Sequence, residues 1–305
     1  MNERSDMHTT VLLREAVDAL ALKEGATAID ATLGSGGHYA QILENVGEMG
    51  MVLGIDADPV AVERAKVRFA MHANARFAVG NCRNVAAIAQ REGIADVDGI
   101  LADLGWRMEQ FSNDPLLGRG KGFSFQHDEP LAMTFGDPAT YAFTAADIVN
   151  EWKEQDIVNV LKPYGEERYA KGIARKIGEY RMTKRIETAS ELAAIIYDAV
   201  PGAYRRGRIH PATKTFQALR IAVNDELDAL TDFIHGALAT LKLGGRLAII
   251  SFHSIEDRIA KHTLRALEDE GRVRRITKKP ITPSVEELHD NPRARSAKLR
   301  IIEKI

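Results

Sequence analysis

The stretch DATLGSGGHY, residues 30–39, holds the first residues whose types and spacing could do chemistry. Gly34, Gly36 and Gly37 stand between a short apolar run and an amphipathic one, which is typical of a strand-to-helix loop that a ligand can approach closely. A dinucleotide fingerprint needs glycine or alanine where Tyr39 stands, and a P-loop needs Gly-Lys-Ser/Thr, so neither pattern is complete. The loop therefore suits a ligand whose approaching end is an amino acid rather than a pyrophosphate.

Polar residues stand at or just after the ends of four predicted strands: Asp30, Asp56, the pair Asn81–Cys82, and Asp103. Ligands of parallel sheets bind beyond the carboxyl ends of the strands, and a carboxylate placed like Asp56 can hold a ribose hydroxyl pair. These positions predict a nucleoside-bearing cofactor, and S-adenosylmethionine fits best. Cys82 has no neighbour that would activate it as a nucleophile, so we interpret it as lining the adenine pocket.

The elements that would position these residues alternate between strand and helix. Near-continuous apolar runs separated by helical stretches indicate an α/β fold with a parallel sheet covered on both faces. Asp58 and Pro59 are typical of the start of a helix. A leucine-rich stripe from Leu219 to Leu241 predicts one long helix that ends at Gly244 and Gly245. The predicted strands are residues 26–33, 51–56, 76–80, 97–104, 246–252 and 298–304.

Residues 109–207 show no convincing strand pattern and predict a helical insertion. Thr144 with Asp147, and Thr188 with Glu191, have the spacing of helix-capping pairs. We therefore expect one domain made of residues 1–108 and 208–305, with residues 109–207 forming a separate, substrate-recognition domain.

Composition sets broad limits on the function. The 305 residues carry a net charge of −2 and a single cysteine, Cys82, which excludes an intrachain disulfide and a multi-cysteine zinc site. His210 and His253 are too few to predict a metal site. Neither a membrane helix nor a secretory signal is visible, so we expect a cytoplasmic protein. Between Arg272 and Arg300, nine Lys or Arg face three acids, which suits either a phosphate backbone or a solvated tail.

Eight blocks of the sequence resemble the bacterial 16S ribosomal RNA cytosine-N4 methyltransferase family. The most specific are HPATKTFQALRIAVNDEL, residues 210–227, and SFHSIEDR, residues 251–258. The others are HTTVLLREAVDAL, DATLGSGGHYAQIL, GIDADP, DGILADLG, YGEERYAKGIARKI and NPRARSAKLR.

The resemblance implies a class I methyltransferase domain with a Rossmann-like, mostly parallel sheet and an inserted all-helical domain. It also implies methylation of the N4 atom of a cytidine in the decoding region of the small ribosomal subunit, and self-association as a homodimer. The cofactor contacts that it implies are Gly36, Gly37, His38, Asp56, Asp103 and Gln110.

The sequence departs from the family pattern near the expected mouth of the pocket. Trp106 to Glu109 replace Val-Ser-Ser-Pro before Gln110, Lys121 replaces an arginine, and Ala132 and Thr134 replace an acid and an arginine. An aromatic residue after the third strand is Cys82 here. These changes leave the cofactor prediction in place and bear on how substrate docks.

The chemistry requires alignment and an acceptor for a hydrogen of the cytosine amino group. We predict Asp103 as the catalytic residue, or the backbone carbonyls of Leu104 and Gly105 in its place. Trp106 is either a base-stacking residue or a core tryptophan, and His253 either orients substrate or is structural. We expect substrate contacts from Trp106, Lys121, His253, Arg293 and Arg295, with further phosphate contacts from Arg205, Arg206, Arg208, Lys171, Arg175 and Lys176.

Three other functions remain open at this point: a methyltransferase acting on another RNA or a small molecule, a non-catalytic RNA-binding assembly factor, and a dehydrogenase. The basic clusters disfavour a small substrate. Asp56 and Asp103 favour an enzyme over an assembly factor, and Tyr39 disfavours a dehydrogenase.

Overall fold

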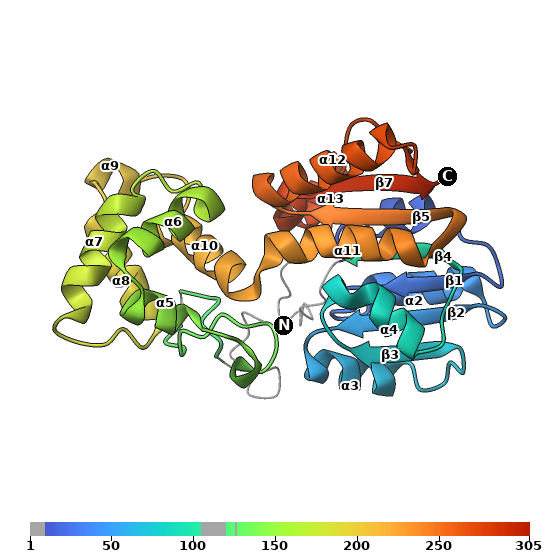
Figure 1. Cartoon of the computed structure of the whole chain (residues 1–305), viewed down its shortest axis with the longest axis horizontal. Coiled ribbons are helices and arrows are strands. Elements are labelled where there is room, and N and C mark those ends of the chain that lie inside the picture. The colour runs from blue at the N-terminus through green and yellow to red at the C-terminus, as the bar shows by residue number, and fades with distance from the viewer. Residues whose placement is uncertain (1–9, 105–119, 126) are drawn as a thin grey trace, which may run out of the picture. The chain divides into compact units, whose positions relative to one another are not determined.

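The computed structural model describes residues 10–104, 120–125 and 127–305, with the side chain of Arg293 excepted, and the chain divides into two compact units (Figure 1). Met1–Trp106 and Leu227–Ile305 form unit 1, and Arg107–Glu226 forms unit 2. The sequence analysis put the second boundary between residues 207 and 208. It lies further along the chain because α10 (Ala212–Asn224) packs against α6 (Glu154–Gly165) of unit 2.

Unit 1 contains one seven-stranded sheet with the strand order β3-β2-β1-β4-β5-β7-β6. Strands β1 to β5 pair in parallel, β7 runs antiparallel to β5, and β6 runs antiparallel to β7. This mixed, mostly parallel sheet confirms the predicted α/β class. The strands are β1 (Thr27–Asp30), β2 (Met51–Asp56), β3 (Ala75–Val79), β4 (Val97–Asp103), β5 (Leu241–Ser251), β6 (Val273–Arg275) and β7 (Lys298–Lys304).

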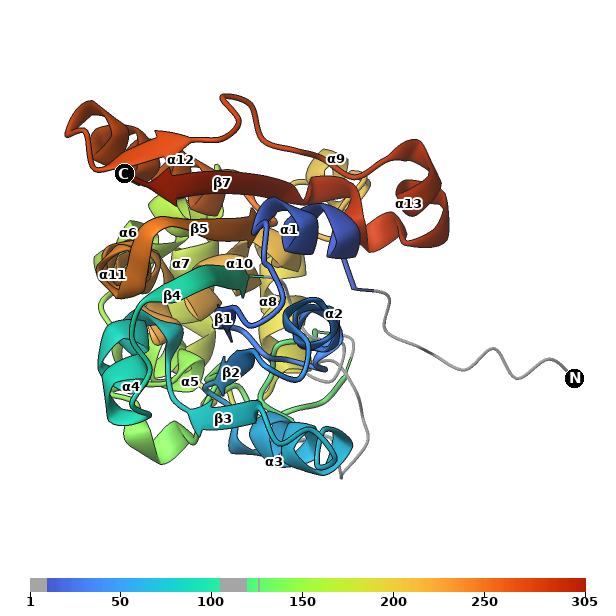
Figure 2. The same ribbon diagram turned by 90° about the vertical axis from the view of Figure 1, so that its right-hand side faces the viewer.

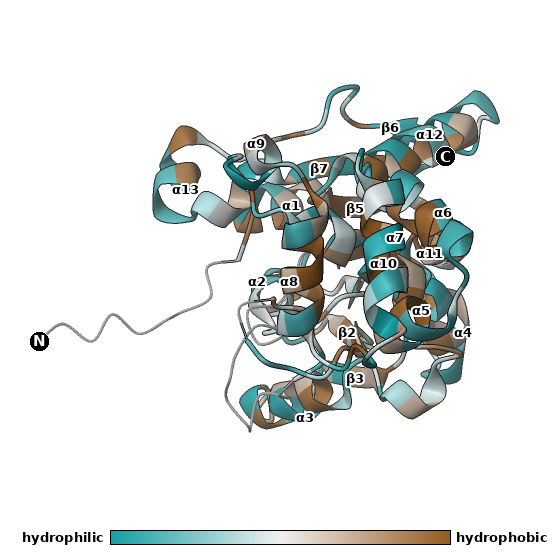
Figure 3. Cartoon of the chain, turned by 90° about the vertical axis from the view of Figure 1, so that its left-hand side faces the viewer, coloured by the Kyte–Doolittle hydropathy of each residue, from teal (hydrophilic) through white to brown (hydrophobic). Residues whose placement is uncertain are grey.

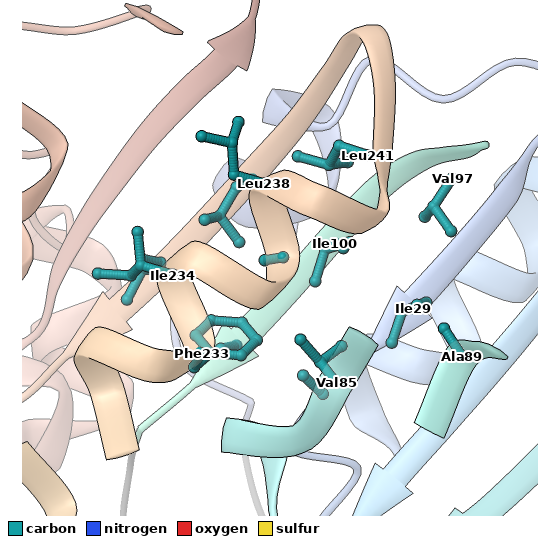
Figure 4. Close-up of a cluster of buried hydrophobic side chains, with 14 of the residues drawn as sticks. Ile29, Val85, Ala89, Val97, Ile100, Phe233, Ile234, Leu238 and Leu241 are labelled. Atoms are coloured by element: carbon teal, nitrogen blue, oxygen red, sulfur yellow. The ribbon is translucent and has the colours of Figure 1, made fainter. Parts of the chain in front are cut away.

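Helices cover both faces of this sheet, as near-continuous apolar strands require (Figure 2). One face carries α1 (Leu13–Ala19), α2 (Gly37–Val46) and α3 (Pro59–Arg68). The other carries α4 (Val85–Arg91), α11 (Glu226–Thr240) and α12 (Ser254–Asp269). Figure 4 shows the second face, where Phe233 and Leu238 lie in one buried cluster with Val85 and Ile100.

The predicted capping residues begin their helices as expected. The side chain of Asp58 accepts a 3.0 Å hydrogen bond from the amide of Val60, and Pro59 is the first residue of α3. Both capping boxes are confirmed, Thr144 with Asp147 at α5 and Thr188 with Glu191 at α8.

Unit 2 is helical in its described part, with an isolated bridge between Pro130 and Thr188. Hydrophilic and hydrophobic residues alternate along helices such as α5 and α6, as expected for helices that bury one side (Figure 3). Its helices are α5 (Ala145–Glu151), α6, α7 (Ala170–Arg181), α8 (Ala189–Ala199), α9 (Gly202–Arg205) and α10, with a short 3-10 turn at Pro138–Thr140.

The prediction of one long helix across residues 216–245 is wrong. Asp225 has a left-handed backbone (φ 49°) and separates α10 from α11, which ends at Thr240 rather than at the glycines. Gly244 (φ 76°) and Gly245 lie inside β5, and a Cβ on Gly245 would come within 2.9 Å of the carbonyl oxygen of Val97. The leucine stripe continues across the break at Asp225, so the sequence pattern did not reveal it. Periodicity does not show which partner α10 and α11 each pack against.

The basic run from Arg272 to Arg300 is not a solvated tail. It contains β6, α13 (Val285–Asp290), a 3-10 turn at Pro292–Ser296, and the start of β7. The sequence analysis missed β6 because a three-residue strand rich in arginine lacks an apolar pattern. In the part of the chain that the structure describes, no helix combines the length and the apolar character needed to cross a bilayer.

Candidate functional site

The glycine loop connects β1 to α2 and requires glycine for two different reasons. Gly36 has φ 79°, a left-handed conformation that side chains with a Cβ rarely adopt, and it directly precedes α2. Gly37 opens α2, and a Cβ there would lie 1.9 Å from Oγ1 of Thr10. The backbone therefore turns tightly and approaches its neighbours too closely for any larger residue.

Asp56 holds this loop from the end of the neighbouring strand β2. Its Oδ2 accepts a 2.9 Å hydrogen bond from the amide of Gly34, and its Oδ1 accepts one of 2.9 Å from the amide of Asp58. The side chain is only 6% exposed. A carboxylate at the end of this strand is placed where it can accept from the hydroxyl groups of a sugar.

Asp30, at the end of β1, is a buried acid that the sequence analysis placed at the crevice but not among the site residues. It is 1% exposed, its Oδ1 accepts a 3.1 Å hydrogen bond from the amide of Thr32, and its Oδ2 has no hydrogen-bond partner. Burial, with smaller effects of Asp103 and Asp56, raises the pKa of Asp30 to about 7. Its position directly before the glycine loop was the available sequence signal.

Asp103 and His38 meet at the same edge of the sheet. Nδ1 of His38 lies 3.8 Å from Oδ2 of Asp103. Nε2 of His38 is 3.1 Å from the carbonyl oxygen of Val11. A carbonyl only accepts, so Nε2 carries a proton in this contact. The amide of Asp103 donates a 2.6 Å hydrogen bond to Oγ1 of Thr32, a residue that the sequence analysis did not single out.

Cys82 begins the turn after β3, beside these acids. Burial of the thiol and the charge of Asp56 raise the pKa of Cys82 to about 12. A thiol with this pKa stays protonated at neutral pH, which excludes a thiolate nucleophile. Its Sγ contacts Oδ1 of Asn81 at 3.7 Å, and it packs against the core cluster of the second face.

Three carboxyl groups therefore converge where β1, β2 and β4 end. Asp30, Asp56 and Asp103 lie close enough that Asp56 and Asp103 both raise the pKa of Asp30. A buried acid with one unsatisfied oxygen, such as Asp30, fits a positively charged ligand. S-adenosylmethionine carries a sulfonium and an ammonium group, so this donor set fits it, with Asp56 placed for its ribose.

His253 follows β5 and has a structural task in this arrangement. Its Nδ1 accepts a 3.2 Å hydrogen bond from the amide of Glu256, and its Nε2 lies 3.1 Å from Oε1 of the same residue. It is thus the capping residue of α12, a histidine in a position that serine or threonine more often fills. A substrate contact of His253 stays a prediction.

The other predicted substrate residues fall in different places. Lys121, in unit 2, donates hydrogen bonds of 3.0 Å and 2.8 Å to the carbonyl oxygens of Phe135 and Gly136. Arg295 is exposed in the 3-10 turn at Pro292–Ser296. The backbone of Arg293 lies in that turn too, but its side chain is outside the described residues, as are Trp106 and Gln110.

Much of the predicted basic cluster is committed to ion pairs within unit 1. Arg274 pairs with Glu303, and Lys298 and Arg300 both pair with Asp257 at 2.8 Å. Arg275 pairs with Glu268 and lowers the pKa of that carboxyl. Lys278, Lys279 and Arg295 are exposed. The run therefore offers a phosphate backbone fewer cations than its composition indicates.

Comparison with known proteins gives a match over nearly the whole chain. Residues 5–305 match the MraW methylase family. Solved structures similar to the chain include an rRNA methylase from Streptococcus thermophilus, at 12% identity over 98% of this chain and 99% of that one, with a TM-score of 0.46.

Two further solved structures resemble the chain. A SAM-dependent O-methyltransferase from Thermotoga maritima is 12% identical over 98% of this chain and 68% of its own, with a TM-score of 0.42. Fibrillarin from Aeropyrum pernix, with natively bound S-adenosyl-L-methionine, is 12% identical over 95% of this chain and 75% of its own, with a TM-score of 0.41.

Proposed function

The chain belongs to the MraW methylase family, and from this premise we propose that it methylates the exocyclic N4 of a cytidine in the decoding region of 16S ribosomal RNA. It is a methyltransferase, and its cofactor is S-adenosylmethionine. The substrate is the small ribosomal subunit or its RNA, the reaction takes place in the cytoplasm, and the enzyme acts as a monomer or a homodimer.

Unit 1 supplies the residues that would hold the cofactor. Asp56 accepts from the ribose hydroxyls, the loop at Gly36 and Gly37 gives the methionine end close access to backbone, and Asp30 faces its positive charge. Cys82 borders the adenine. Gln110, which belongs to unit 2 and lies outside the described residues, is the remaining cofactor contact that we propose. When bound, the cofactor supplies an electrophilic methyl group.

Asp103 is the residue that we assign to the chemistry. The lone pair of cytosine N4 is delocalised into the ring, so its attack on a methyl group requires an acceptor for an amino hydrogen. The amide of Asp103 is fixed by Thr32 at 2.6 Å, and His38 stands beside its carboxylate at 3.8 Å. Asp103 can then accept a hydrogen bond from the amino group as the new bond forms. The carbonyls of Leu104 and Gly105 are the alternative acceptors.

Specificity for one cytidine would come from residues of both units. Trp106 would stack on the extruded base, and Lys121, His253, Arg293 and Arg295 would contact the RNA around it. Unit 2, with its basic helices, would recognise the RNA substrate.

One observation carries the proposal: the convergence of Asp30, Asp56 and Asp103 at one edge of the sheet, with Oδ2 of Asp30 left without a partner. A non-catalytic assembly factor would have no need for this arrangement, because the unsatisfied buried oxygen of Asp30 has a free-energy cost when the carboxyl group is ionised.

The test combines binding with product analysis. Calorimetry should show binding of S-adenosylmethionine and none of NAD. Small subunits from cells lacking the gene should gain one methyl group on a cytidine base when they are incubated with the protein and S-adenosylmethionine. Mass spectrometry of RNA digests locates this methyl group. Asp103→Asn should lower turnover more than cofactor affinity. Asp96→Asn, an exposed change just before the opposite end of β4, is the matched control.

Methylation at another atom or in another RNA would replace the proposed substrate. Normal turnover in Asp103→Ala would remove Asp103 from the mechanism. Cofactor binding with no methylation of any RNA would favour the assembly factor.

A further inference from the structure

Unit 2 carries two groups of aromatic rings and arginines that the methyl-transfer site does not use. The guanidinium of Arg205 lies 4.7 Å from the ring centre of Tyr197, and that ring lies 6.4 Å from His210 at an angle of 24°. His210 in turn stacks on Phe125 at 4.5 Å. Rings and cations from α8, α9 and the start of α10 are therefore gathered in one place.

The second group lies just before α7 and in α9. The guanidinium of Arg168 lies 5.0 Å from the ring of Tyr204 and 5.1 Å from that of Tyr169. The hydroxyl of Tyr204 donates a 2.9 Å hydrogen bond to Oε2 of Glu167. This bond links α9 to the residues just before α7, and Arg205 follows Tyr204 in the chain, so the two groups are neighbours.

Several of these groups are open to solvent. Tyr197 is 42% exposed, and His210, Arg206 and Arg208 are exposed. Among the described residues, neither Arg206 nor Arg208 has an ion-pair partner, in contrast to most arginines of the basic run in unit 1. Exposed rings beside arginines without ion-pair partners suit a ligand that has both flat and anionic groups.

The geometry is also rigid. Arg205 donates hydrogen bonds to the carbonyl oxygens of Val200 (3.0 Å) and Asp198 (3.1 Å), which fix it over Tyr197. Nδ1 of His210 accepts from the amide of Ala212 at 3.2 Å, and partial burial lowers the pKa of His210. At neutral pH, His210 is thus an uncharged planar ring, and the positive charge comes from the arginines.

We propose that this surface, made of Arg168, Tyr197, Arg205, Arg206, Arg208 and His210, binds a single-stranded segment of the RNA substrate. Unpaired bases pack against the solvent-exposed parts of the Tyr197 and His210 rings, whose other sides contact Arg205 and Phe125, and phosphates contact Arg206 and Arg208. Every base has a flat face, so stacking on rings suits unpaired RNA, whereas the bases of a duplex are not accessible to such rings. The inference rests on the proposed function, because it takes RNA as the substrate.

The experiment measures binding of a fluorescein-labelled, unstructured RNA of about 12 nucleotides, enough for several stacked bases and phosphates, and of a hairpin duplex of equal length. Fluorescence anisotropy of the full chain is followed over a series of salt concentrations without cofactor. The variants are Tyr197→Ala, Tyr197→Phe, Arg206→Gln and Arg208→Gln. Lys153→Gln is the control, since Lys153 is exposed beside the far end of α6.

The two kinds of contact should give different signatures. Tyr197→Ala should weaken binding about 5- to 100-fold at every salt concentration, with the slope of log K against log salt unchanged, and Tyr197→Phe should restore it. Arg206→Gln and Arg208→Gln should each reduce that slope by about 0.7, the value for one phosphate contact on a single strand. The control should bind like wild type.

Wild-type affinity in Tyr197→Ala and in the two arginine variants would overturn the inference and leave the proposed function intact. The inference would also be overturned if the wild type preferred the duplex. The same holds if these variants lost binding to a ribosomal protein while their RNA binding stayed unchanged. If the wild type binds cofactor but no RNA at any salt concentration, the proposed RNA substrate fails as well. Thermal unfolding of each variant, and cofactor binding to it, should match wild type.

Discussion

The amide of Gly34 donates a 2.9 Å hydrogen bond to the carboxylate of Asp56, so the residue that ends β2 shapes the loop that follows β1. The two strands are parallel neighbours, and their carboxyl ends lie at the same edge of the sheet. The carboxylate predicted to hold the ribose therefore also sets the position of the backbone that is predicted to meet the other end of the cofactor.

Replacing Asp56 should weaken cofactor binding and also destabilise the glycine loop, because the amide of Gly34 loses its acceptor. Asp56→Ala removes hydrogen bonds of a charged group, each worth about 1.5–3 kcal/mol, so affinity for S-adenosylmethionine should fall by at least about tenfold. Calorimetry measures this directly. The control is Asp58→Asn, because asparagine also caps a helix well. Equal affinities of Asp56→Ala and wild type would separate Asp56 from the cofactor.

Gly37→Ala should destabilise unit 1 by steric overlap. The new Cβ would lie 1.9 Å from Oγ1 of Thr10, and overpacking of this kind costs about 1–3 kcal/mol. Urea unfolding should show the loss in the single variant and its partial recovery when Thr10→Gly is added.

A second glycine provides the matched control for that experiment. Gly172 lies inside α7, where a Cβ would meet only the carbonyl oxygen of Ala199 at 3.6 Å. Gly172→Ala should therefore stabilise the protein by about 0.5–1 kcal/mol, the helix preference of alanine over glycine. A loss of stability there comparable to that of Gly37→Ala would contradict the steric explanation.

Asp30 should make stability depend on pH in a direction opposite to that of most acids. Its pKa is raised from 3.8 to about 7, so the folded state keeps a proton that the unfolded state has lost. The contribution of Asp30 to the free energy of unfolding is fully present below pH 4 and is lost as the pH rises through 7. Its full size is about 4 kcal/mol, at about 1.4 kcal/mol for each tenfold change in proton affinity.

The measurement compares unfolding of wild type and Asp30→Asn from pH 4 to pH 8. The stability of wild type relative to the variant should decrease across this range. Because the ionised carboxylate attracts a cationic ligand, wild-type affinity for S-adenosylmethionine should rise from pH 6 to pH 8, and that of the variant should change less. A constant difference in stability would show that Asp30 titrates normally.

Arg220 and Glu226 form a buried bidentate pair in unit 2, with distances of 2.6 Å and 2.7 Å. Arg220→Met leaves the Glu226 carboxylate without this partner and should cost about 3–5 kcal/mol. Arg175→Gln, which breaks an exposed contact with Glu179, should cost less than about 1 kcal/mol. Chemical denaturation measures both, and equal losses would argue against the importance of burial.

Cys82 should react slowly with iodoacetamide. With a thiol pKa of about 12, almost no thiolate exists at pH 8. Mass spectrometry should show alkylation at least about 100-fold slower in the folded protein than in urea, where the thiol has its ordinary pKa near 8.5. Rapid alkylation of the folded protein would contradict the burial of this group.

The sequence by itself determined the features that depend on neighbouring residues. Asp58 with Pro59, Thr144 with Asp147, and Thr188 with Glu191 begin helices because a cap needs only a side chain and an amide two or three residues away. The apolar runs predicted the parallel strands, because they too are patterns of residues that are close together in the chain. The glycine loop and the acids after the strands sufficed to place a candidate cofactor site.

Only the tertiary structure decided which long-range partner each residue has. The break at Asp225 depends on two helices that pack against different units, and the capping role of His253 and the ion pairs of the basic run depend on contacts across the fold. The unsatisfied oxygen of Asp30 exists only because β1, β2 and β4 end together. Periodicity and capping are local in the chain, whereas burial and charge pairing join residues far apart in it, and no spacing rule records those contacts.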